Sequence, residues 1–328
     1  MSTRKPLVVP NPADQIASMR INRLRKTHQL DLFVAGIVDA SVKSDMTSML
    51  MPFFSVAKRP NTQVKEFIVG NKTLKIEPGQ KGQPTIWDKD ILIYCASQIT
   101  AALNNNVSVG RTVMADSYAL LTATDRGTGG NSYDLLVQAI SRIKGTQYSI
   151  EEDNPEPGVK RRWRALPAFI EDAIVTEYDD KKRAVSIDIV LGEAFYDALL
   201  LHDVLTFSSD YFLIRGGTER RLYELGRRFC GDKLSFSISL KKLQSRTGNE
   251  GTLRKFRENI VKLAKGQESE LPEFIVQYDP KAQKQEGGKV TFIKRTAEEE
   301  EVKRARNDQR ETNRLELLRS KRKARISG

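Results

Sequence analysis

Two stretches of the chain carry side chains that can hydrogen-bond to the edges of DNA bases. Asparagine, glutamine and arginine can each make two hydrogen bonds to one base, and glutamate can accept a hydrogen bond from cytosine. The candidates in the first stretch are Asn131, Asp134, Gln138, Ser141 and Arg142. The candidates in the second stretch are Arg254, Lys255, Arg257, Glu258 and Lys262. Taken singly, each set is also compatible with an ordinary solvated helix surface.

A second group of residues has the charge to contact phosphate groups. Lysine and arginine that neutralise phosphates contribute affinity and orientation rather than sequence information. After the first stretch these residues are Lys144, Lys160, Arg161, Arg162 and Arg164. After the second stretch they are Lys265, Lys281, Lys284 and Lys289. Each candidate reading face is therefore followed by a basic segment.

The elements expected to position these residues follow the same order twice. Residues 111–150 predict a strand, a helix over about 116–124, a glycine-containing turn, a helix ending near 144 and a strand, and a basic strand follows after the turn NPEPG. Residues 233–294 predict a strand, a helix over about 240–245, the turn RTGN, a helix over about 251–265 and two further strands. This order is typical of a winged helix-turn-helix, whose second helix enters the major groove.

Apolar positions of the two candidate reading helices repeat at a constant offset of 120 residues, from Tyr133 to Leu253. The matching sets are Tyr133, Leu136, Ile140 and Ile143, and Leu253, Phe256, Ile260 and Leu263. Such spacing is common in any amphipathic helix and does not by itself indicate a repeated domain. The similar turn before each helix and hairpin after it make a repeated domain the better interpretation. We therefore predict an α+β fold with tandem winged-helix domains.

The rest of the chain completes a domain plan. We predict a mobile arm over 1–28, an N-terminal DNA-binding winged-helix domain over 29–192, a C-terminal DNA-binding winged-helix domain over 193–296, and a charged tail over 297–328. Within the first domain, Gly70-Asn71 predicts a hairpin over 66–77. A buried scaffold helix with Asp88 at its cap follows, and residues 165–191 alternate as strands.

Composition favours a polyanionic partner. The 54 lysine and arginine residues outnumber the 42 aspartate and glutamate residues, which gives a formal net charge of +12. No stretch approaches the roughly 20 apolar residues that a bilayer span needs, so a membrane partner is not expected. Cys95 and Cys230 fall in separate helical patterns, which favours reduced core thiols in a cytoplasmic protein.

The sequence lacks the motifs that would indicate a metal site, a nucleophilic tyrosine beside a metal, or a phosphate-binding loop. His28 and His202 are isolated and no CxxC pair occurs, so we expect no metal site. The nine tyrosines have no HxH cluster beside them, and Gly127, Gly129 and Gly130 belong to no GxxxxGK[ST] loop. We therefore expect neither a cofactor nor catalysis.

Five segments resemble the plasmid replication initiator protein A family of bacteria. They are residues 33–60, 85–99 (TIWDKDILIYCASQI), 123–136 (ATDRGTGGNSYDLL), 204–214 and 218–231 (TERRLYELGRRFCG), and the resemblance covers roughly Leu32 to Arg295. It implies tandem winged-helix domains that bind repeated sites, or iterons, in double-stranded plasmid origin DNA. It also implies opening of an AT-rich segment, recruitment of the host replication initiator and replicative helicase, and autorepression as a self-dimer. The dimerisation surface would then belong mainly to the N-terminal domain over 29–192.

Two other functions stay open at this point. One is a transcriptional repressor that binds DNA with the same surface but has no initiator activity. The other is an enzyme that cleaves or transfers DNA strands, which the missing metal and nucleophile patterns disfavour.

Overall fold

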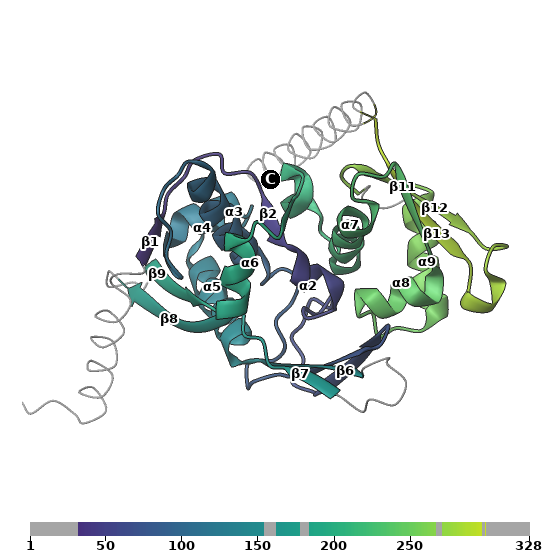
Figure 1. Cartoon of the computed structure of the whole chain (residues 1–328), viewed down its shortest axis with the longest axis horizontal. Helices are drawn as coiled ribbons and strands as arrows, with labels where there is room; N and C mark the ends of the chain where they lie inside the picture. Colours follow the sequence, from purple (N-terminus) through teal and green to yellow (C-terminus); the bar gives the residue numbers. More distant parts are fainter. Residues whose placement is uncertain (1–31, 154–161, 178–183, 267–270, 297–298, 300–328) are drawn as a thin grey trace, which may run out of the picture. The chain divides into compact units, whose positions relative to one another are not determined.

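The computed structural model describes residues 32–153, 162–177, 184–266, 271–296 and 299. The chain divides into two compact units, Met1–Phe207 and Ser208–Gly328 (Figure 1). This division falls after the predicted boundary at 192/193, so that α6 (Glu193–Leu200) and β10 (Val204–Thr206) belong to the first unit. The predicted arm over 1–28 lies outside the described residues, as does the predicted tail over 297–328 except Glu299.

One sheet of the first unit has four strands in the order β1-β5-β9-β8. These strands are β1 (Leu32–Ala35), β5 (Thr112–Asp116), β9 (Ala184–Leu191) and β8 (Ile170–Glu177). β1 runs parallel to β5, and the other neighbours are antiparallel. Alternate residues such as Phe33, Val113 and Ile189 are buried, because strand side chains point to opposite faces in turn. The predicted strand pair within 165–191 is confirmed as β8 and β9.

Helix α3 (Asp90–Asn104) lies at the centre of the first unit and is buried along most of its length. The predicted scaffold helix is thus confirmed, but the prediction that Asp88 caps it was wrong. The N-cap residue is Lys89, which makes no side-chain capping hydrogen bond. Asp88 instead accepts a hydrogen bond of 2.8 Å from the backbone N–H of Thr85, within the turn that precedes α3.

Two helices follow β5, as the sequence predicted. Helix α4 (Ser117–Ala123) begins at Asp116, whose carboxylate accepts a hydrogen bond of 2.7 Å from the N–H of Ala119. Helix α5 (Gly130–Gly145) comes after a glycine-rich turn. Three of its four predicted core residues are buried, namely Leu136, Ile140 and Ile143. The fourth, Tyr133, is half-buried and packs against the core.

A second sheet of the first unit joins two hairpins that the sequence predicted separately. Its order is β3-β4-β6-β7, and all neighbours are antiparallel. The strands are β3 (Lys65–Val69), β4 (Lys72–Glu77), β6 (Gln147–Asp153) and β7 (Arg162–Ala165). Gly70 has a φ of 69° in the β3–β4 turn, the backbone conformation for which a glycine was predicted there.

Short elements complete the first unit, and among them the sequence analysis did not identify β2, α2 and β10. β2 (Lys43–Asp45) pairs antiparallel with β10. Helix α2 (Met46–Leu50) follows β2, and the Asp45 carboxylate accepts a hydrogen bond of 2.7 Å from the N–H of Ser48 at its start. Helix α6 contacts α3.

The second unit places one helix-turn-helix between the strands of a single sheet. Its elements are the 3-10 helix η1 (Ser209–Leu213), α7 (Gly217–Cys230), β11 (Ser235–Ser239), α8 (Leu240–Thr247), α9 (Leu253–Ala264), β12 (Phe274–Asp279), the 3-10 helix η2 (Lys284–Glu286) and β13 (Lys289–Lys294). The sheet order is β11-β13-β12 and both pairings are antiparallel. The predicted core residues Phe256, Ile260 and Leu263 of α9 are buried, and Leu253 is half-buried.

The two units share an order of elements, which is helix, strand, helix, helix, strand and strand. In the first unit these are α3, β5, α4, α5, β6 and β7, and in the second unit they are α7, β11, α8, α9, β12 and β13. They differ in one respect, because β11 lies in the same sheet as β12 and β13 whereas β5 lies in a different sheet from β6 and β7. The predicted α+β class is confirmed. Within the described ranges, no helix combines the length and apolarity needed to cross a membrane.

Candidate nucleic-acid interface

The exposed face of α9 carries every base-reading candidate that the sequence predicted for the second unit. Burial of Phe256 and Ile260 turns the opposite side of the helix outward. The exposed residues on it are Arg254, Lys255, Arg257, Glu258 and Lys262, and Lys265 is exposed at the C-cap. The helix begins at Thr252, whose hydroxyl accepts a hydrogen bond of 3.2 Å from the N–H of Lys255.

The charges on this face interact with one another only weakly. Glu258 lies 3.4 Å from Nε of Arg254 and 3.5 Å from Nζ of Lys255. The Arg254 side chain is 88% exposed, and exposed ion pairs contribute at most about 1 kcal/mol. A phosphate or a base can therefore displace Glu258 at small cost.

The loop between β12 and β13 is folded back beside the helices. The Tyr278 hydroxyl donates a hydrogen bond of 2.8 Å to the carbonyl of Gly287. Gly288 has a φ of 111°, and a Cβ there would lie 2.6 Å from the Tyr278 ring, so this position requires glycine. A Cβ on Gly287 would lie 3.2 Å from the Leu253 side chain and 3.5 Å from Nη2 of Arg257. The loop is thus held next to the first turns of α9.

This loop and the start of β13 carry three of the four phosphate-contact candidates of the second unit, and Lys265 at the end of α9 is the fourth. Lys281 and Lys284 are exposed, and Lys289 is half-buried at the start of β13. Hydrogen bonds from the backbone N–H groups of Lys281 and Ala282 lower the pKa of the Asp279 carboxyl. Asp279 therefore stays ionised and orders the turn that presents Lys281.

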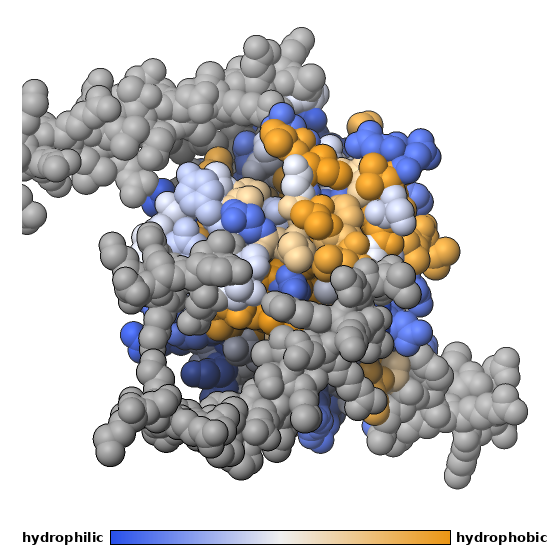
Figure 2. All heavy atoms as spheres, turned by 90° about the vertical axis from the view of Figure 1, so that its left-hand side faces the viewer, coloured by the Kyte–Doolittle hydropathy of each residue, from blue (hydrophilic) through white to orange (hydrophobic). Residues whose placement is uncertain are grey.

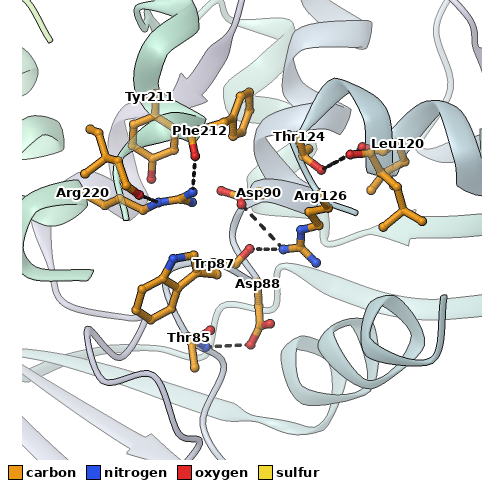
Figure 3. A network of polar contacts seen from close by, with 12 residues as sticks. Thr85, Trp87, Asp88, Asp90, Leu120, Thr124, Arg126, Tyr211, Phe212 and Arg220 are labelled. Atoms are coloured by element: carbon orange, nitrogen blue, oxygen red, sulfur yellow. Dashed lines mark hydrogen bonds and ion pairs between the residues drawn. The ribbon is translucent and has the colours of Figure 1, made fainter. Parts of the chain in front are cut away.

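A buried arginine holds the helix-turn-helix of the second unit to α7. Arg221 donates hydrogen bonds of 3.2 Å from Nε and from Nη2 to the carbonyl of Arg246, near the end of α8. Its Nη1 donates a hydrogen bond of 2.8 Å to Glu224, which also accepts one of 3.1 Å from the Tyr211 hydroxyl. The preceding Arg220 donates to the carbonyls of Ile214 and Phe212, at 2.8 and 2.9 Å, the second of which Figure 3 shows. The sequence analysis missed this cluster, although an Arg and a Glu three residues apart on a predicted helix were a signal for it.

In the first unit, most of the predicted reading residues lie on the exposed side of α5. These residues are Asn131, Asp134, Gln138 and Ser141. The Ser141 hydroxyl donates a hydrogen bond of 2.9 Å to the carbonyl of Val137 in the preceding turn. The predicted orientation of α5 is therefore confirmed at these positions, while their contact with bases stays a prediction.

The placement of Arg142 on the outward side of α5 was wrong. Its side chain is only 11% exposed, and its Nε and Nη2 donate hydrogen bonds of 2.8 and 2.7 Å to the two carboxylate oxygens of Asp88. The physical reason is that a helix flank facing a buried carboxylate gains a charge-assisted, two-pronged hydrogen bond. The neighbouring Lys144 is exposed as predicted and lies 3.1 Å from Asp172 of β8.

Arg126, in the turn before α5, makes a second contact with the segment that starts α3. Its guanidinium donates a hydrogen bond to the carbonyl of Trp87 and lies 3.7 Å from the carboxylate of Asp90 (Figure 3). The Asp90 side chain is 2% exposed. The sequence analysis missed this pair as well, although two acids at the start of a helix predicted to be buried require cationic or hydrogen-bonding partners.

The predicted phosphate-contact strand of the first unit is described only in part. Lys160 and Arg161 lie outside the described residues. Arg162 and Arg164 lie on β7 at the edge of the sheet, in register with Asp153 and Glu151. The adjoining hairpin carries mixed charge, since Lys72 lies 3.3 Å from Glu152. Phosphate contact by these arginines stays a prediction.

An apolar surface lies on another side of the first unit. Figure 2, which faces the side of Figure 1 where β1, β8 and β9 are drawn, shows apolar side chains gathered there. Leu32 and Val34 of β1 are 39% and 62% exposed, and Val38 just after β1 is 82% exposed. Exposed apolar residues that cluster in this way are typical of protein contact sites.

The described residues offer little for metal or thiol chemistry. Cys95 and Cys230 are free and buried, and burial raises the pKa of the Cys95 thiol to about 12. Among the described residues no group of three or more histidine, cysteine, aspartate or glutamate side chains is placed to hold a metal ion.

Known proteins resemble this chain in sequence and in fold. A model of the family described as Replication initiator protein A matches residues 43–276. The chain is 34% identical over 261 residues to a protein of Wigglesworthia glossinidia brevipalpis named "Putative replication protein". The aligned region covers 78% of this chain and 92% of that protein. The crystal structure of domains 2 and 3 of RctB superposes with a TM-score of 0.55 at 14% identity, over 76% of this chain and 98% of that one. The likeness to RctB concerns the fold alone.

Proposed function

This chain belongs to the replication initiator protein A family, and from that membership we propose that it initiates plasmid replication by binding repeated sites in double-stranded origin DNA. In this proposal both units act as winged-helix domains, with α5 and α9 as the helices that enter the major groove. The observation that carries the proposal is the exposed, mostly basic face of α9 beside a basic, folded loop.

The element order supports the winged-helix interpretation. A strand before the helix pair and two strands after it give a reading helix and a hairpin that contacts the DNA backbone. In the second unit β11, β12 and β13 form one sheet around α8 and α9. In the first unit the equivalent hairpin is β6–β7, and β3–β4 extends it.

Two reading helices in one chain favour direct repeats as the target. Successive major grooves on one side of a duplex lie about 34 Å apart, so two helices cover a repeat of about two turns. Asn131, Gln138, Arg254 and Glu258 supply the hydrogen bonds to bases, and Lys281 and Lys284 contact phosphates. The protein acts without a cofactor and without cleaving DNA.

The proposal includes three further steps that follow from family membership. The bound protein opens an adjacent AT-rich segment, brings in the host initiator and replicative helicase in the bacterial cytoplasm, and represses its own gene as a dimer. The apolar side chains of β1 and Val38 supply a surface for self-association in the first unit.

DNase footprinting of the full-length protein on its own plasmid origin tests the proposal. We expect protection at regularly spaced direct repeats, which weakens strongly with added salt because phosphate contacts release counterions. A single protected palindrome would contradict the proposal. Replication of a minimal plasmid without the gene would instead favour a transcriptional repressor, and nicking of supercoiled origin DNA would reveal an enzyme.

A further inference from the structure

Three residues at the start of α3, Trp87, Asp88 and Asp90, contact α5 and the turn that precedes it. Arg126 lies in the turn before α5, and Arg142 lies in its last turn. Both arginines bind the segment from Trp87 to Asp90. Arg142 thus links the last turn of α5 to the buried scaffold helix, and Arg126 links the turn that leads into α5, so α5 cannot rotate without straining the Arg142 contact.

The contact at the C-terminal end is the stronger of the two. Arg142 uses two nitrogens on the two oxygens of Asp88, at 2.8 and 2.7 Å, and the side chains are 11% and 5% exposed. A forked pair of this kind fixes direction as well as distance, because both hydrogen bonds must stay parallel. The carboxylate of Asp88 is itself held by the N–H of Thr85.

Asp88 also lies near the hairpin that follows α5. The buried Tyr148 of β6 has a raised pKa, mainly because of its burial and also because of the negative charge of Asp88. The same carboxylate therefore stands where α3, α5 and the β6–β7 hairpin converge.

We propose that Asp88 is a positioning residue for DNA recognition, which sets the angle of α5 through Arg142 and so controls discrimination between origin repeats and other DNA. This inference rests on the proposed function. It assigns to Asp88 no contact with DNA, and it assigns to Arg142 an orienting role in place of base reading.

Three variants of the full-length protein test this inference. Asp88→Asn keeps the size of the side chain but weakens the pair of hydrogen bonds from Arg142. Arg142→Lys keeps the positive charge but cannot make both hydrogen bonds. The third variant combines the two substitutions. Glu66→Gln on the exposed surface of β3 is the matched control for a lost carboxylate. Affinity is measured for an origin repeat and for a scrambled duplex of the same length and composition.

We expect each single variant to reduce the ratio of repeat to scrambled affinity by about tenfold, with scrambled affinity unchanged. The double variant should lose no more than either single variant, because both changes remove one contact. If Asp88→Asn retains the ratio while Arg142→Lys loses it, Arg142 reads a base directly and the inference is wrong. An equal loss on both duplexes would also overturn it, because that result indicates a purely structural role.

Amide hydrogen exchange of the free protein separates this inference from the proposed function. In Asp88→Asn we expect the amides of α5 and of the Asp125–Gly130 turn to exchange at least about tenfold faster, and those of α9 to stay unchanged. Unchanged exchange in α5 would overturn the inference even if the protein binds its origin. Faster exchange in a protein that binds no origin repeat would instead contradict the proposed function alone.

Discussion

Arg221 on α7 donates two hydrogen bonds to one acceptor, the carbonyl oxygen of Arg246 near the C-terminal end of α8. The last carbonyls of a helix have no partner within the helix, so an arginine supplies what the helix lacks. Because the turn to α9 begins just after Arg246, this contact fixes the end of α8 from which that turn starts. In the first unit the arginine is on the other partner: Arg126, in the turn between the two helices, donates a hydrogen bond to the carbonyl of Trp87 just before α3.

The Arg221 contact gives a first prediction. Arg221→Met removes one charged partner of the buried Glu224, and breaking a buried pair from one side costs about 3 to 5 kcal/mol. We expect the free energy of unfolding of the second unit to fall by about 3 kcal/mol in urea denaturation. The control is Arg227→Met, whose side chain is 20% exposed and makes a longer contact of 3.3 Å with Glu273. Equal losses in the two variants would contradict this assignment.

Arg254 and Lys284 should differ in how their loss depends on DNA sequence. Arg254→Ala should weaken binding to origin repeats by about 1 to 3 kcal/mol and leave scrambled DNA almost unaffected, if Arg254 contacts a base. Lys284→Ala should weaken binding to every duplex and reduce the slope of log affinity against log salt by about one. Titrations at several salt concentrations measure both effects. If Arg254→Ala weakens binding to origin repeats and to scrambled DNA equally, Arg254 contacts a phosphate and not a base.

High pH should destabilise the first unit. Burial raises the pKa of Cys95 from its ordinary 9.0 to about 12 and that of Tyr94 from 10.0 to about 12. Between these values the unfolded chain releases protons that the folded chain retains, so the free energy of unfolding decreases as pH rises. The contribution is complete below pH 9 and is lost as pH approaches 12. Urea midpoints of Cys95→Ala should decline less over this range, and an identical decline would exclude Cys95 as a source.

Self-association should depend on the apolar side chains of β1. Val34 is 62% exposed, and an aspartate at this position would place an unpaired charge in any apolar interface. We expect Val34→Asp to raise the dimer dissociation constant by about tenfold or more in sedimentation experiments. Leu234→Asp in the second unit, where the native side chain is 80% exposed, is the matched control. A dimer unaffected by Val34→Asp would place the interface elsewhere.

Periodicity explains why much of the fold could be predicted from the sequence. Leu136, Ile140, Phe256 and Ile260 recur at helical spacing, and all four are buried. The exposed positions opposite them, including Gln138, follow from the same geometry. Local signals also sufficed for the hairpin at Gly70, because that turn needs a positive φ.

Contacts between distant parts of the sequence could not be predicted in the same way. Arg142 is placed outward by its helical phase alone, but Asp88, which lies far away in the sequence, draws it to the flank. The pairing of β4 with β6 likewise depends on strands from two separate hairpins. Helix α6 was assigned to the second domain because its amphipathic pattern does not reveal that it contacts α3.

Strand β6 has a hydrogen-bonded neighbour on each side, β4 and β7. A hairpin standing alone must be immobilised when it meets a ligand, and that loss of motion subtracts from the affinity. The β6–β7 hairpin is braced by β4 before any encounter with DNA. In the proposed complex with DNA, the first unit should therefore lose less affinity to ordering of this hairpin than an isolated hairpin would.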